Sequence, residues 1–379
     1  MLNLLKTVVE TCLRLFGFPT KTGLRMFGNP GPDAPVFVTC NFELTVRRVS
    51  KVLEEMDCYL LVAPSKGINV WCAAGGGIFN AHSVISVLKT SGIAERVNHR
   101  TLILPQLGAP GVDLQRVEEA TGWRCKFGPA HAADIPDYVQ NGFRKTPEMS
   151  LVRFPLRDRV ETAAMWAFPM SVIAAIALAI FSPGSIPGAL LLIWGFALAL
   201  YILFDPILRY VPGPVSLVKI SLLGLAAAAG LAAYGLLIGD WPTGKLIGWS
   251  AGALLVAIVM GFDLEGQTPL YAPSSITYWG TRHPSYMKLF LKLFAAMGFV
   301  MEPFFTVHVD GEKCTGCGTC VEVCPKGVYA LHRINGKQRS DVVDQAACEQ
   351  CTACVKQCPY GAIWSKPPIQ TFERDRARL

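Results

Sequence analysis

The chain has 379 residues, a formal net charge of +7 and a mean hydropathy of +0.36, with 51% hydrophobic and only 17% charged residues. This composition is typical of a protein that is partly embedded in a membrane and partly soluble, and its length allows two or three domains. Because the basic residues are scattered, with no long run and no interleaved aromatic residues, nucleic acid is not an expected partner.

Residues 1–34 are predicted to form an N-terminal segment that precedes the first domain. Apolar residues recur at helical spacing in residues 1–17, which predicts a short amphipathic helix with a packing role. The segment has no apolar core followed by a small-residue cleavage site, so we do not expect a signal peptide.

Residues 35–159 alternate short apolar runs with helical patterns, which predicts an α/β domain with a parallel, Rossmann-like sheet. The expected strands are 35–39, 58–62, 68–71 and 101–105, and the expected helices are 45–56 and 112–121. Ligands of such sheets bind beyond the carboxyl ends of the strands. Three loops leave those ends in the prediction, at residues 39–41, 106–108 and 128–130.

Residues 160–263 are predicted to form a transmembrane domain of four helices. The apolar stretches lie at about 162–182, 187–204, 215–239 and 246–262. Each is long enough, or nearly so, to cross ~30 Å of hydrocarbon, and four such stretches with almost no internal charge make a buried soluble bundle improbable.

Lysine and arginine are more frequent on the flanks of this region than in the loops after the first and third stretches. The positive-inside rule therefore predicts a multi-pass protein of the cytoplasmic membrane, with both soluble parts in the cytoplasm. Residues 264–303 are predicted to form a linker in which 284–300 is an interfacial helix, because Lys288 and Lys292 interrupt its apolar pattern.

Residues 304–365 contain eight cysteines in two identical runs with the spacing C-x2-C-x2-C-x3-C-P, which is typical of ferredoxins that carry two [4Fe–4S] clusters. The fourth cysteine of each run ligates the other cluster in such proteins. The predicted ligands of cluster 1 are Cys314, Cys317, Cys320 and Cys358, and those of cluster 2 are Cys348, Cys351, Cys354 and Cys324. Because both runs match the ferredoxin spacing, disulfides or a zinc site are disfavoured. Residues 366–379 are predicted to form a tail.

These predictions give a multi-domain fold class: a Rossmann-like α/β domain, a four-span transmembrane α-helical domain and an α+β ferredoxin domain. Iron–sulfur ligands require a reducing compartment, in which disulfides are not expected. The cysteines outside the two runs form no metal signature; they are Cys12, Cys40, Cys58, Cys72 and Cys125. Apart from Cys72, most of them are predicted to be packed core residues.

Cys72 lies in a stretch of small residues, 67–77, that allows a large flat ligand to approach closely. From the residues alone, a buried cysteine in a glycine-rich turn is the simpler interpretation. However, the stretch Asn69-Val70-Trp71-Cys72-Ala73-Ala74-Gly75 closely resembles the signature of the corrinoid protein of bacterial mercury methylation.

Further similarity to that family covers residues 38–45, 99–112, 146–149 and 153–159, and thus most of 35–160. The related domain of the corrinoid iron–sulfur protein of the acetyl-CoA pathway has the same layout. The ferredoxin end resembles the partner that works with the mercury-methylating corrinoid protein. Over nearly its whole length, the chain therefore resembles a fusion of those two proteins.

This resemblance implies a corrinoid-dependent methyltransferase of the mercury-methylation type, with a cobalamin-type corrinoid and two [4Fe–4S] clusters as cofactors. Cys72 is implied to be the catalytic residue, as the lower axial ligand of cobalt through its thiolate. The other implied corrinoid-binding residues lie in the cap helix and the strand-end loops; they are Thr39, Asn41, Thr45, Asn69, Val70, Trp71, Ala73, Ala74, Gly75, Gln106, Leu107, Gly108, Gly128, Pro129 and Ala130.

The implied partners are a methylated pterin or its methyltransferase as methyl donor, Hg(II) or another soft acceptor, a low-potential electron donor, and membrane lipid. Two features differ from the family: Gly76 replaces a lysine, and the tail from Trp364 to Leu379 has no cysteine. Two alternatives therefore stay open. One is corrinoid methyl transfer to another acceptor or in one-carbon metabolism, and the other is a membrane-tethered ferredoxin electron carrier without corrinoid activity.

Overall fold

The computed structural model of the chain describes residues 2–14, 16–203, 207, 216–267, 305–334, 336–348, 350–366 and 368. The chain divides into two compact units. One consists of Met1–Leu15 and Arg153–Trp279, and the other of Phe16–Val152 and Gly280–Leu379. The second unit contains the predicted α/β domain and the two cysteine runs, and the first contains the apolar helices.

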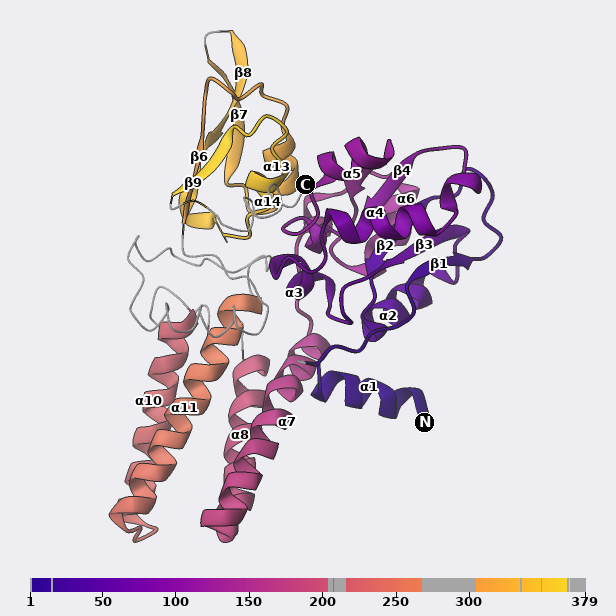
Figure 1. The fold of residues 1–379 in the computed structure, drawn as a ribbon. Coiled ribbons are helices and arrows are strands. Elements are labelled where there is room, and N and C mark those ends of the chain that lie inside the picture. Colours follow the sequence, from indigo (N-terminus) through magenta and orange to yellow (C-terminus); the bar gives the residue numbers. More distant parts are fainter. Residues whose placement is uncertain are drawn as a thin grey trace. The chain divides into compact units, whose positions relative to one another are not determined.

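The α/β part is built on a five-stranded sheet with the strand order β1-β3-β2-β4-β5 (Figure 1). The strands are β1 (Gly23–Phe27), β2 (Val36–Cys40), β3 (Cys58–Ala63), β4 (Thr101–Leu104) and β5 (Arg124–Phe127). β1 pairs antiparallel with β3, and the other pairings are parallel. Every residue of β2 and β3 is buried, as expected for central parallel strands covered on both faces.

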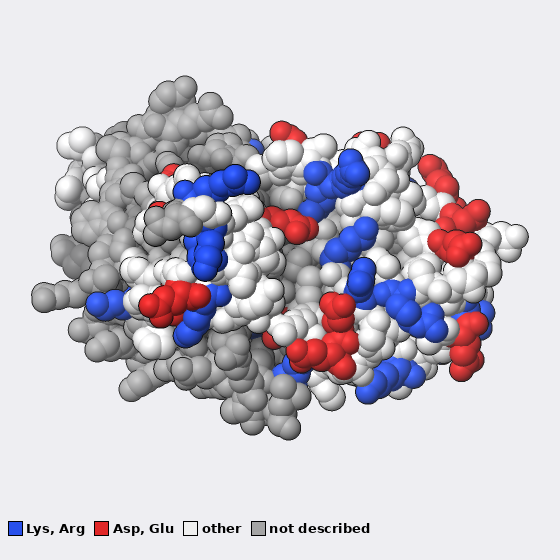
Figure 2. All heavy atoms as spheres, turned by 90° about the horizontal axis from the view of Figure 1, so that it is seen from above, with Lys and Arg blue, Asp and Glu red and all other residues white. Residues whose placement is uncertain are grey.

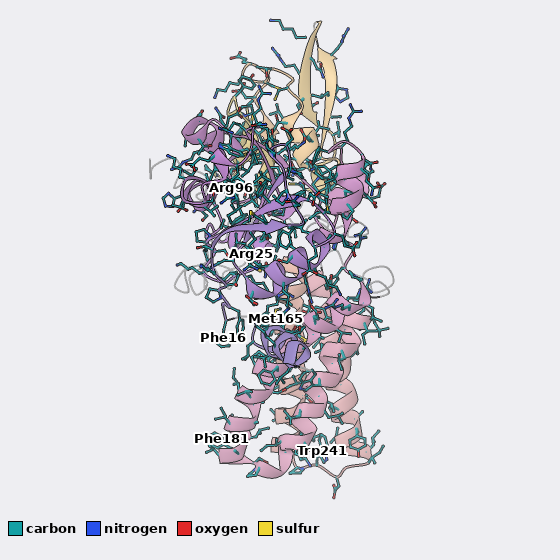
Figure 3. All side chains as sticks on the ribbon, turned by 90° about the vertical axis from the view of Figure 1, so that its right-hand side faces the viewer. Phe16, Arg25, Arg96, Met165, Phe181 and Trp241 are labelled. Carbon is teal, nitrogen blue, oxygen red and sulfur yellow. The ribbon has the colours of Figure 1, made fainter. Side chains whose placement is uncertain are left out.

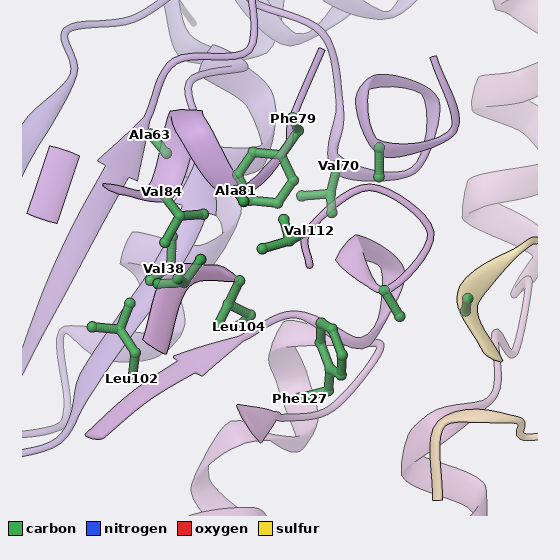
Figure 4. Packing of buried hydrophobic residues seen from close by; sticks show 14 of the residues in the cluster. Val38, Ala63, Val70, Phe79, Ala81, Val84, Leu102, Leu104, Val112 and Phe127 are labelled. Carbon is green, nitrogen blue, oxygen red and sulfur yellow. The ribbon is translucent and has the colours of Figure 1, made fainter. Parts of the chain in front are cut away.

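Helices cover both faces of this sheet, because successive strand residues point to opposite sides. Phe37 packs in one buried cluster with residues of α2 (Glu43–Leu53) and α6 (Ile135–Gln140). Val38 packs in another with residues of α4 (Ala81–Thr90) and α5 (Leu114–Thr121), as Figure 4 shows for Val38, Val84 and Leu102. The remaining helix, α3 (Val70–Gly75), is short and follows β3. Single 3-10 turns lie at Ile93–Glu95, Gln106–Gly108, Ala132–Asp134 and Pro147–Ser150.

The structure confirms the predicted parallel α/β layout and corrects one of its elements. Residues 68–71 do not form a strand, because Asn69 caps the N-terminus of α3 and accepts a hydrogen bond from the Cys72 amide. A four-residue apolar run fits a strand and a buried helical turn equally well, and the cap decides between them. The sheet also includes β1, which precedes the predicted start of the domain at residue 35.

The other unit contains α7 (Leu156–Phe181), α8 (Ile186–Ile202), α10 (Ser216–Leu237) and α11 (Thr243–Gln267). α7 packs against α8, α10 against α11, and α1 (Leu2–Cys12) against α7. Figure 3 shows Phe181 and Trp241 at the same end of these helices, with Met165 toward the other end. Large apolar side chains of α7, such as Ile180 at 72% exposure, point away from the protein, as expected for contact with lipid.

Among the residues that the structure describes, three helices are long and apolar enough to cross a membrane: Leu156–Phe181, Pro183–Ile202 and Thr243–Met260. The described apolar segment of α10 is shorter, Leu222–Leu237, so the prediction of four spans is not confirmed. The predicted interfacial helix at 284–300 lies outside the described residues, as does most of the tail.

The cysteine-rich part contains two antiparallel strand pairs and two short helices. β6 (Thr306–Val309) pairs with β9 (Ile363–Lys366), and β7 (Tyr329–Ile334) with β8 (Lys337–Val342). α13 (Thr319–Val323) ends just before Cys324, and α14 (Ala353–Gln357) ends just before Cys358. A 3-10 turn at Gln345–Ala347 precedes the second run. Each cysteine run thus folds as a loop followed by a short helix, as expected from the repeated spacing.

Candidate functional site

The Cys72 side chain lies on the partly exposed side of α3 and is held by Asn69. The Asn69 Oδ1 accepts from the Cys72 amide at 2.9 Å, and the Asn69 Nδ2 donates to the Cys72 Sγ at 3.3 Å. A hydrogen bond donated to sulfur favours the thiolate over the thiol. The single asparagine therefore starts the helix and also orients a sulfur that can bind a metal ion.

The opposite side of α3 is packed closely against the end of the sheet. Ala73 and Ala74 are 0% and 2% exposed. Gly111 lies against this helix so closely that a Cβ there would be 2.6 Å from the Ala74 Cα. Figure 4 shows Val70 and Val112 in the same packed group. One side of α3 is therefore held by the packing against Gly111, and its other side carries the half-exposed Cys72 and the exposed Gly75.

The first strand-end loop supports this arrangement from within. The Asn41 Oδ1 accepts from the Ser65 amide at 2.8 Å, the Ser65 hydroxyl at 2.9 Å and the Gly67 amide at 3.0 Å. Its Nδ2 donates to the Thr20 carbonyl at 3.2 Å. Asn41 thus fixes the segment that leads into α3, rather than presenting its amide at the surface. Thr39 is buried, and Thr45 is half-buried on α2.

The other two loops are largely buried. Gln106 is 2% exposed; its Nε2 donates to the Val323 carbonyl at 3.2 Å, and its Oε1 accepts from Lys145. Leu107 is half-buried, and Gly108 is buried. Gly128 and Pro129 are buried and Ala130 half-buried, and the Ala130 amide donates to the Met149 carbonyl at 2.7 Å. The predicted corrinoid-binding residues that keep exposed surface are therefore concentrated on α3.

The cysteine-rich part gathers the four predicted ligands of cluster 1 around one pocket. Cys314, Cys317, Cys320 and Cys358 all line it, so three residues of the first run meet the fourth of the second. Four polar contacts reach their sulfurs. The Ser340 hydroxyl lies 3.0 Å from the Cys320 Sγ, and the Thr319 hydroxyl lies 3.4 Å from the Cys317 Sγ. The Ser340 amide donates to the Cys314 Sγ at 3.4 Å, and the Ala362 amide donates to the Cys358 Sγ at 3.2 Å. Hydrogen bonds to cluster sulfurs are a known means of tuning reduction potential.

The four predicted ligands of cluster 2 are also neighbours. Burial raises the pKa of Cys354, and negative charge on Cys351, Cys348 and Cys324 raises it further. The Tyr329 hydroxyl donates to the Cys354 Sγ at 3.1 Å. Among the described residues, no group of three His, Cys, Asp or Glu side chains could hold a single metal ion. The members of each predicted set of four thiols lie near one another, which is compatible with two cross-ligated clusters.

The remaining cysteines and His99 have packing roles. Cys40 and Cys58 are fully buried in the sheet, and burial raises the pKa of Cys58 and of Cys125 to about 12, which keeps these thiols protonated. The His99 Nε2 lies 2.9 Å from the Ala34 carbonyl, and its ring packs edge-on against Trp123. This agrees with the expectation that most spare thiols are core residues.

Sequence reasoning missed several residues of these sites. Asn69 was expected to shape the helix that covers the corrin ring, but not to hold the Cys72 sulfur. The available signal was the spacing, because an asparagine at the N-cap commonly contacts the residue three positions later. Tyr329 and Ser340 lie between the two cysteine runs, where no motif indicates that their hydroxyls approach cluster ligands.

Two parts of the chain match different families of known proteins. Residues 18–139 match the family model described as the CO dehydrogenase/acetyl-CoA synthase delta subunit, and residues 308–372 match that of a 4Fe-4S dicluster domain. The acetyl-CoA decarbonylase/synthase complex subunit gamma of Methanothermobacter thermautotrophicus is 38% identical over 119 residues, which is 31% of this chain and 26% of that protein.

The same subunit of Methanocaldococcus jannaschii is 34% identical over 125 residues, or 32% of this chain and 25% of that protein. The corrinoid/iron-sulfur protein large subunit of Moorella thermoacetica is 32% identical over 119 residues, or 31% and 26%. The chain thus covers about a quarter of the length of these relatives. The predicted acetyl-CoA-pathway resemblance is confirmed, and the matches support a corrinoid and iron–sulfur clusters as the cofactors. The chain therefore joins an α/β domain similar to corrinoid iron–sulfur proteins of the acetyl-CoA pathway to a two-cluster 4Fe-4S domain.

Proposed function

We propose that the protein is a membrane-anchored, corrinoid-dependent methyltransferase whose own ferredoxin domain reduces the cobalt centre, with Hg(II) as the methyl acceptor. The observation that carries the proposal is the Cys72 sulfur, held by Asn69 on a short helix whose other side is packed against a corrinoid-type sheet. The eight cysteines in the same compact unit would hold the two iron–sulfur clusters that deliver electrons to cobalt.

In this proposal, the Cys72 sulfur would hold the cobalt of a bound corrinoid. The corrinoid would supply the methyl-carrying metal, and the protein would tune its reactivity. A thiolate in this position would supply electron density, as a cysteine does to haem iron, which would favour transfer of the methyl group to a soft electrophile. The Asn69 amide stabilises the thiolate and fixes its direction. The small side chains of Ala73, Ala74 and Gly75 leave room for a flat macrocycle.

The cluster ligands keep the cross-ligated partition, with Cys358 in cluster 1 and Cys324 in cluster 2. The membrane domain is proposed to have four spans, with α10 as the third, and with both soluble parts in the cytoplasm. The support is the pairing of α7 with α8 and of α10 with α11, together with the distribution of lysine and arginine.

A second candidate is methyl transfer to another acceptor in one-carbon metabolism. It is favoured by the named relatives, which are subunits of acetyl-CoA decarbonylase/synthase complexes and a corrinoid/iron-sulfur protein. The loss of the lysine at Gly76 and the absence of cysteines from the tail also fit this candidate, since thiolates are the natural ligands of mercury. The third candidate is an electron carrier without corrinoid.

The test begins with anaerobically purified full-length protein. Cobalt and iron analysis, with the visible spectrum, separates the two methyltransferase candidates from the electron carrier: cobalt-free protein that fails to bind added corrinoid contradicts the proposal. Single-turnover transfer from the methylated corrinoid to inorganic Hg(II), compared with transfer to a thiol, then decides the acceptor. Transfer to the thiol with none to mercury favours the second candidate. Cys12→Ala is the matched control for Cys72→Ala, because Cys12 is a half-buried thiol on α1 outside the site.

A further inference from the structure

The α/β domain and the cysteine-rich domain share a continuous buried contact within one compact unit. Val323 of α13 and Phe305 belong to the same buried apolar cluster as Val112 and Phe127. Apolar packing of this kind holds two surfaces together but does not fix their register. The register is fixed by polar side chains that cross the contact.

Gln357, the last residue of α14, makes most of these polar contacts. Its Nε2 donates to the Ala109 carbonyl at 2.9 Å and to the Val112 carbonyl at 2.7 Å, and its Oε1 accepts from the Leu114 amide at 3.3 Å. The side chain is only 7% exposed. Both donors and the acceptor of the amide are thus used across the domain contact, with little water available to replace them.

Gln106 makes the reciprocal contact from the α/β domain, through its hydrogen bond to the Val323 carbonyl. Val323 directly precedes Cys324, and Gln357 directly precedes Cys358, which are the fourth cysteines of the two runs. Val323, which Gln106 contacts, and Gln357 thus occupy equivalent positions of the repeated motif. Each contact is one residue away from a predicted cluster ligand.

Charges across the contact are complementary. Burial lowers the pKa of Lys145 to about 8, and the Glu322 carboxylate of α13 opposes that shift. Lys356 is 5% exposed, its Nζ lies 3.5 Å from the Gly111 carbonyl, and its charge opposes the effect of burial on the pKa of Asp113. A positive group on each domain thus lies near a negative group on the other, which favours one relative orientation.

The segment that Gln357 binds is also the one that supports the helix of Cys72. Residues 109–112 receive the hydrogen bonds of Gln357 on one side. On the other side Gly111 lies against Ala74, two residues after Cys72, with no room for a Cβ. The loop thus touches both the cluster-bearing helix and the helix of the proposed cobalt ligand.

We propose that Gln357, with Gln106, is a positioning residue that docks the ferredoxin domain on the 109–114 loop, so that electrons reach cobalt within one chain. This inference rests on the proposed function. In each transfer one electron leaves a reduced cluster and enters cobalt; no bond to the protein is formed or broken, and an external low-potential one-electron donor reduces the cluster again. Gln357 itself carries no electron and acts through the register of the contact.

The test compares Gln357→Leu with Gln338→Leu in the full-length, anaerobic holoprotein. Gln338 is an exposed glutamine on β8 of the same domain and serves as the matched control. Hydrogen–deuterium exchange of the peptide that contains Leu114 measures docking of the two domains, and this measurement does not depend on bound corrinoid. Electron transfer is followed optically after limiting photoreduction of the clusters. For Gln357→Leu we expect faster exchange and at least tenfold slower cobalt reduction, with unchanged iron content and cluster potentials.

A second variant covers the case in which Gln357→Leu loses its clusters. Glu322 is exposed, so Glu322→Lys keeps the fold, but the new lysine repels Lys145 and Lys126. We expect faster hydrogen exchange and slower cobalt reduction in this variant. Higher salt should not make either effect larger, because salt screens the repulsion between the lysines. Unchanged exchange in both variants overturns the docking role. Faster exchange with unchanged cobalt reduction overturns the positioning role and leaves the proposed function intact. Absence of corrinoid from the protein overturns the proposed function and the electron route together, while the exchange result still decides docking.

Discussion

Asn69 contacts Cys72 twice, at its backbone amide and at its sulfur. The amide of Asn69 begins α3 through its oxygen and contacts the sulfur through its nitrogen, so the geometry of the helix and of the ligand are coupled. By contrast, the buried thiols of Cys58 and Cys125 stay protonated because burial raises the pKa of each to about 12. Cys72 differs from Cys58 in being half-exposed, and its sulfur accepts a hydrogen bond from Asn69.

Replacing Cys72 with alanine is expected to abolish methyl transfer and shift the visible spectrum of bound corrinoid, because the sulfur ligand is lost. The fold should be retained, since Cys72 is half-exposed. Visible spectroscopy and circular dichroism of the purified variant measure both effects. An unchanged spectrum and turnover in Cys72→Ala, with corrinoid bound, contradicts the axial-ligand role.

Replacing Asn69 with alanine removes the cap and the donor to sulfur together. We expect a loss of stability of about 1 kcal/mol, which is typical of a lost N-cap, and weaker sulfur ligation. Asn69→Asp restores the acceptor for the Cys72 amide but not the donor to sulfur. Denaturant unfolding should therefore separate the alanine variant from wild type, whereas the corrinoid spectrum should be altered in both variants. A spectrum that stays at wild type in Asn69→Asp shows that the donor is not needed.

At the scale of elements, the cysteine-rich part consists of two repeats, each a cysteine run with a short helix. α13 and α14 each end one residue before a cysteine that is predicted to ligate the cluster of the other run, and Cys358 lines the pocket of the first run. If this assignment holds, neither half forms a cluster site alone. Metal binding and folding are coupled in such sites.

The purified protein is expected to contain about eight irons and about eight acid-labile sulfides per chain, as two [4Fe–4S] clusters require. Replacing Cys317 with serine should lose cluster 1 and loosen the region around cluster 2, because Cys358 is then left without its cluster. Iron analysis and electron paramagnetic resonance of the reduced protein measure this. Tightly bound zinc with no iron in anaerobic preparations contradicts the cluster assignment.

The contact between α3 and the 109–112 loop tolerates only glycine at position 111. A Cβ there would be 2.2 Å from the Phe79 carbonyl oxygen and 2.6 Å from the Ala74 Cα, so the backbone has to move. We expect Gly111→Ala to cost about 1–3 kcal/mol in the free energy of unfolding, as overpacking does. Gly31→Ala is the control, because nothing lies within 4 Å of its Cβ position. Equal stability of the two variants contradicts the close packing of α3.

At the scale of the whole molecule, charge is distributed without a large field of one sign on the face shown in Figure 2, where lysine and arginine lie among aspartate and glutamate. The local charges at the domain contact therefore matter more than the net charge of the chain. Lys145 is the clearest case, because it is largely buried and its pKa is lowered to about 8.

The depressed pKa of Lys145 predicts a pH dependence of stability. Between pH ~8 and ~10.5 the unfolded chain keeps the Lys145 proton while the folded protein releases it, so this residue makes the protein more stable as pH rises through that range. Buried cysteines with raised pKa values act in the opposite direction, so the comparison is with Lys145→Met, in which the lysine contribution is absent. We expect the difference in unfolding free energy between the two proteins to change by about 2 kcal/mol between pH 7 and pH 10, and to show no such change if Lys145 stays charged.

The membrane topology is tested with single added cysteines. Ser185→Cys lies between α7 and α8, and Lys337→Cys lies at the start of β8. An impermeant maleimide is expected to label position 185 in intact cells and position 337 only after lysis, with the wild-type chain as background. Labelling of position 337 in intact cells overturns the proposed orientation.

The amino-acid sequence by itself determined the features that depend on neighbouring residues. Ligands three or four positions apart are close in almost any fold, so the cysteine runs were predictable. Central parallel strands are apolar throughout, so the strands at 36–40, 58–63 and 101–104 were predictable as well. The strand predicted at 68–71 was wrong, because a short apolar run carries no period of its own and the Asn69 cap decides the outcome. Only the tertiary structure decided the contacts of Gln357 with Ala109 and of Gln106 with Val323, which join residues 248 and 217 positions apart. Hydrogen bonds between such distant buried groups follow from how the domains pack, and they leave no pattern in the order of residues along the chain.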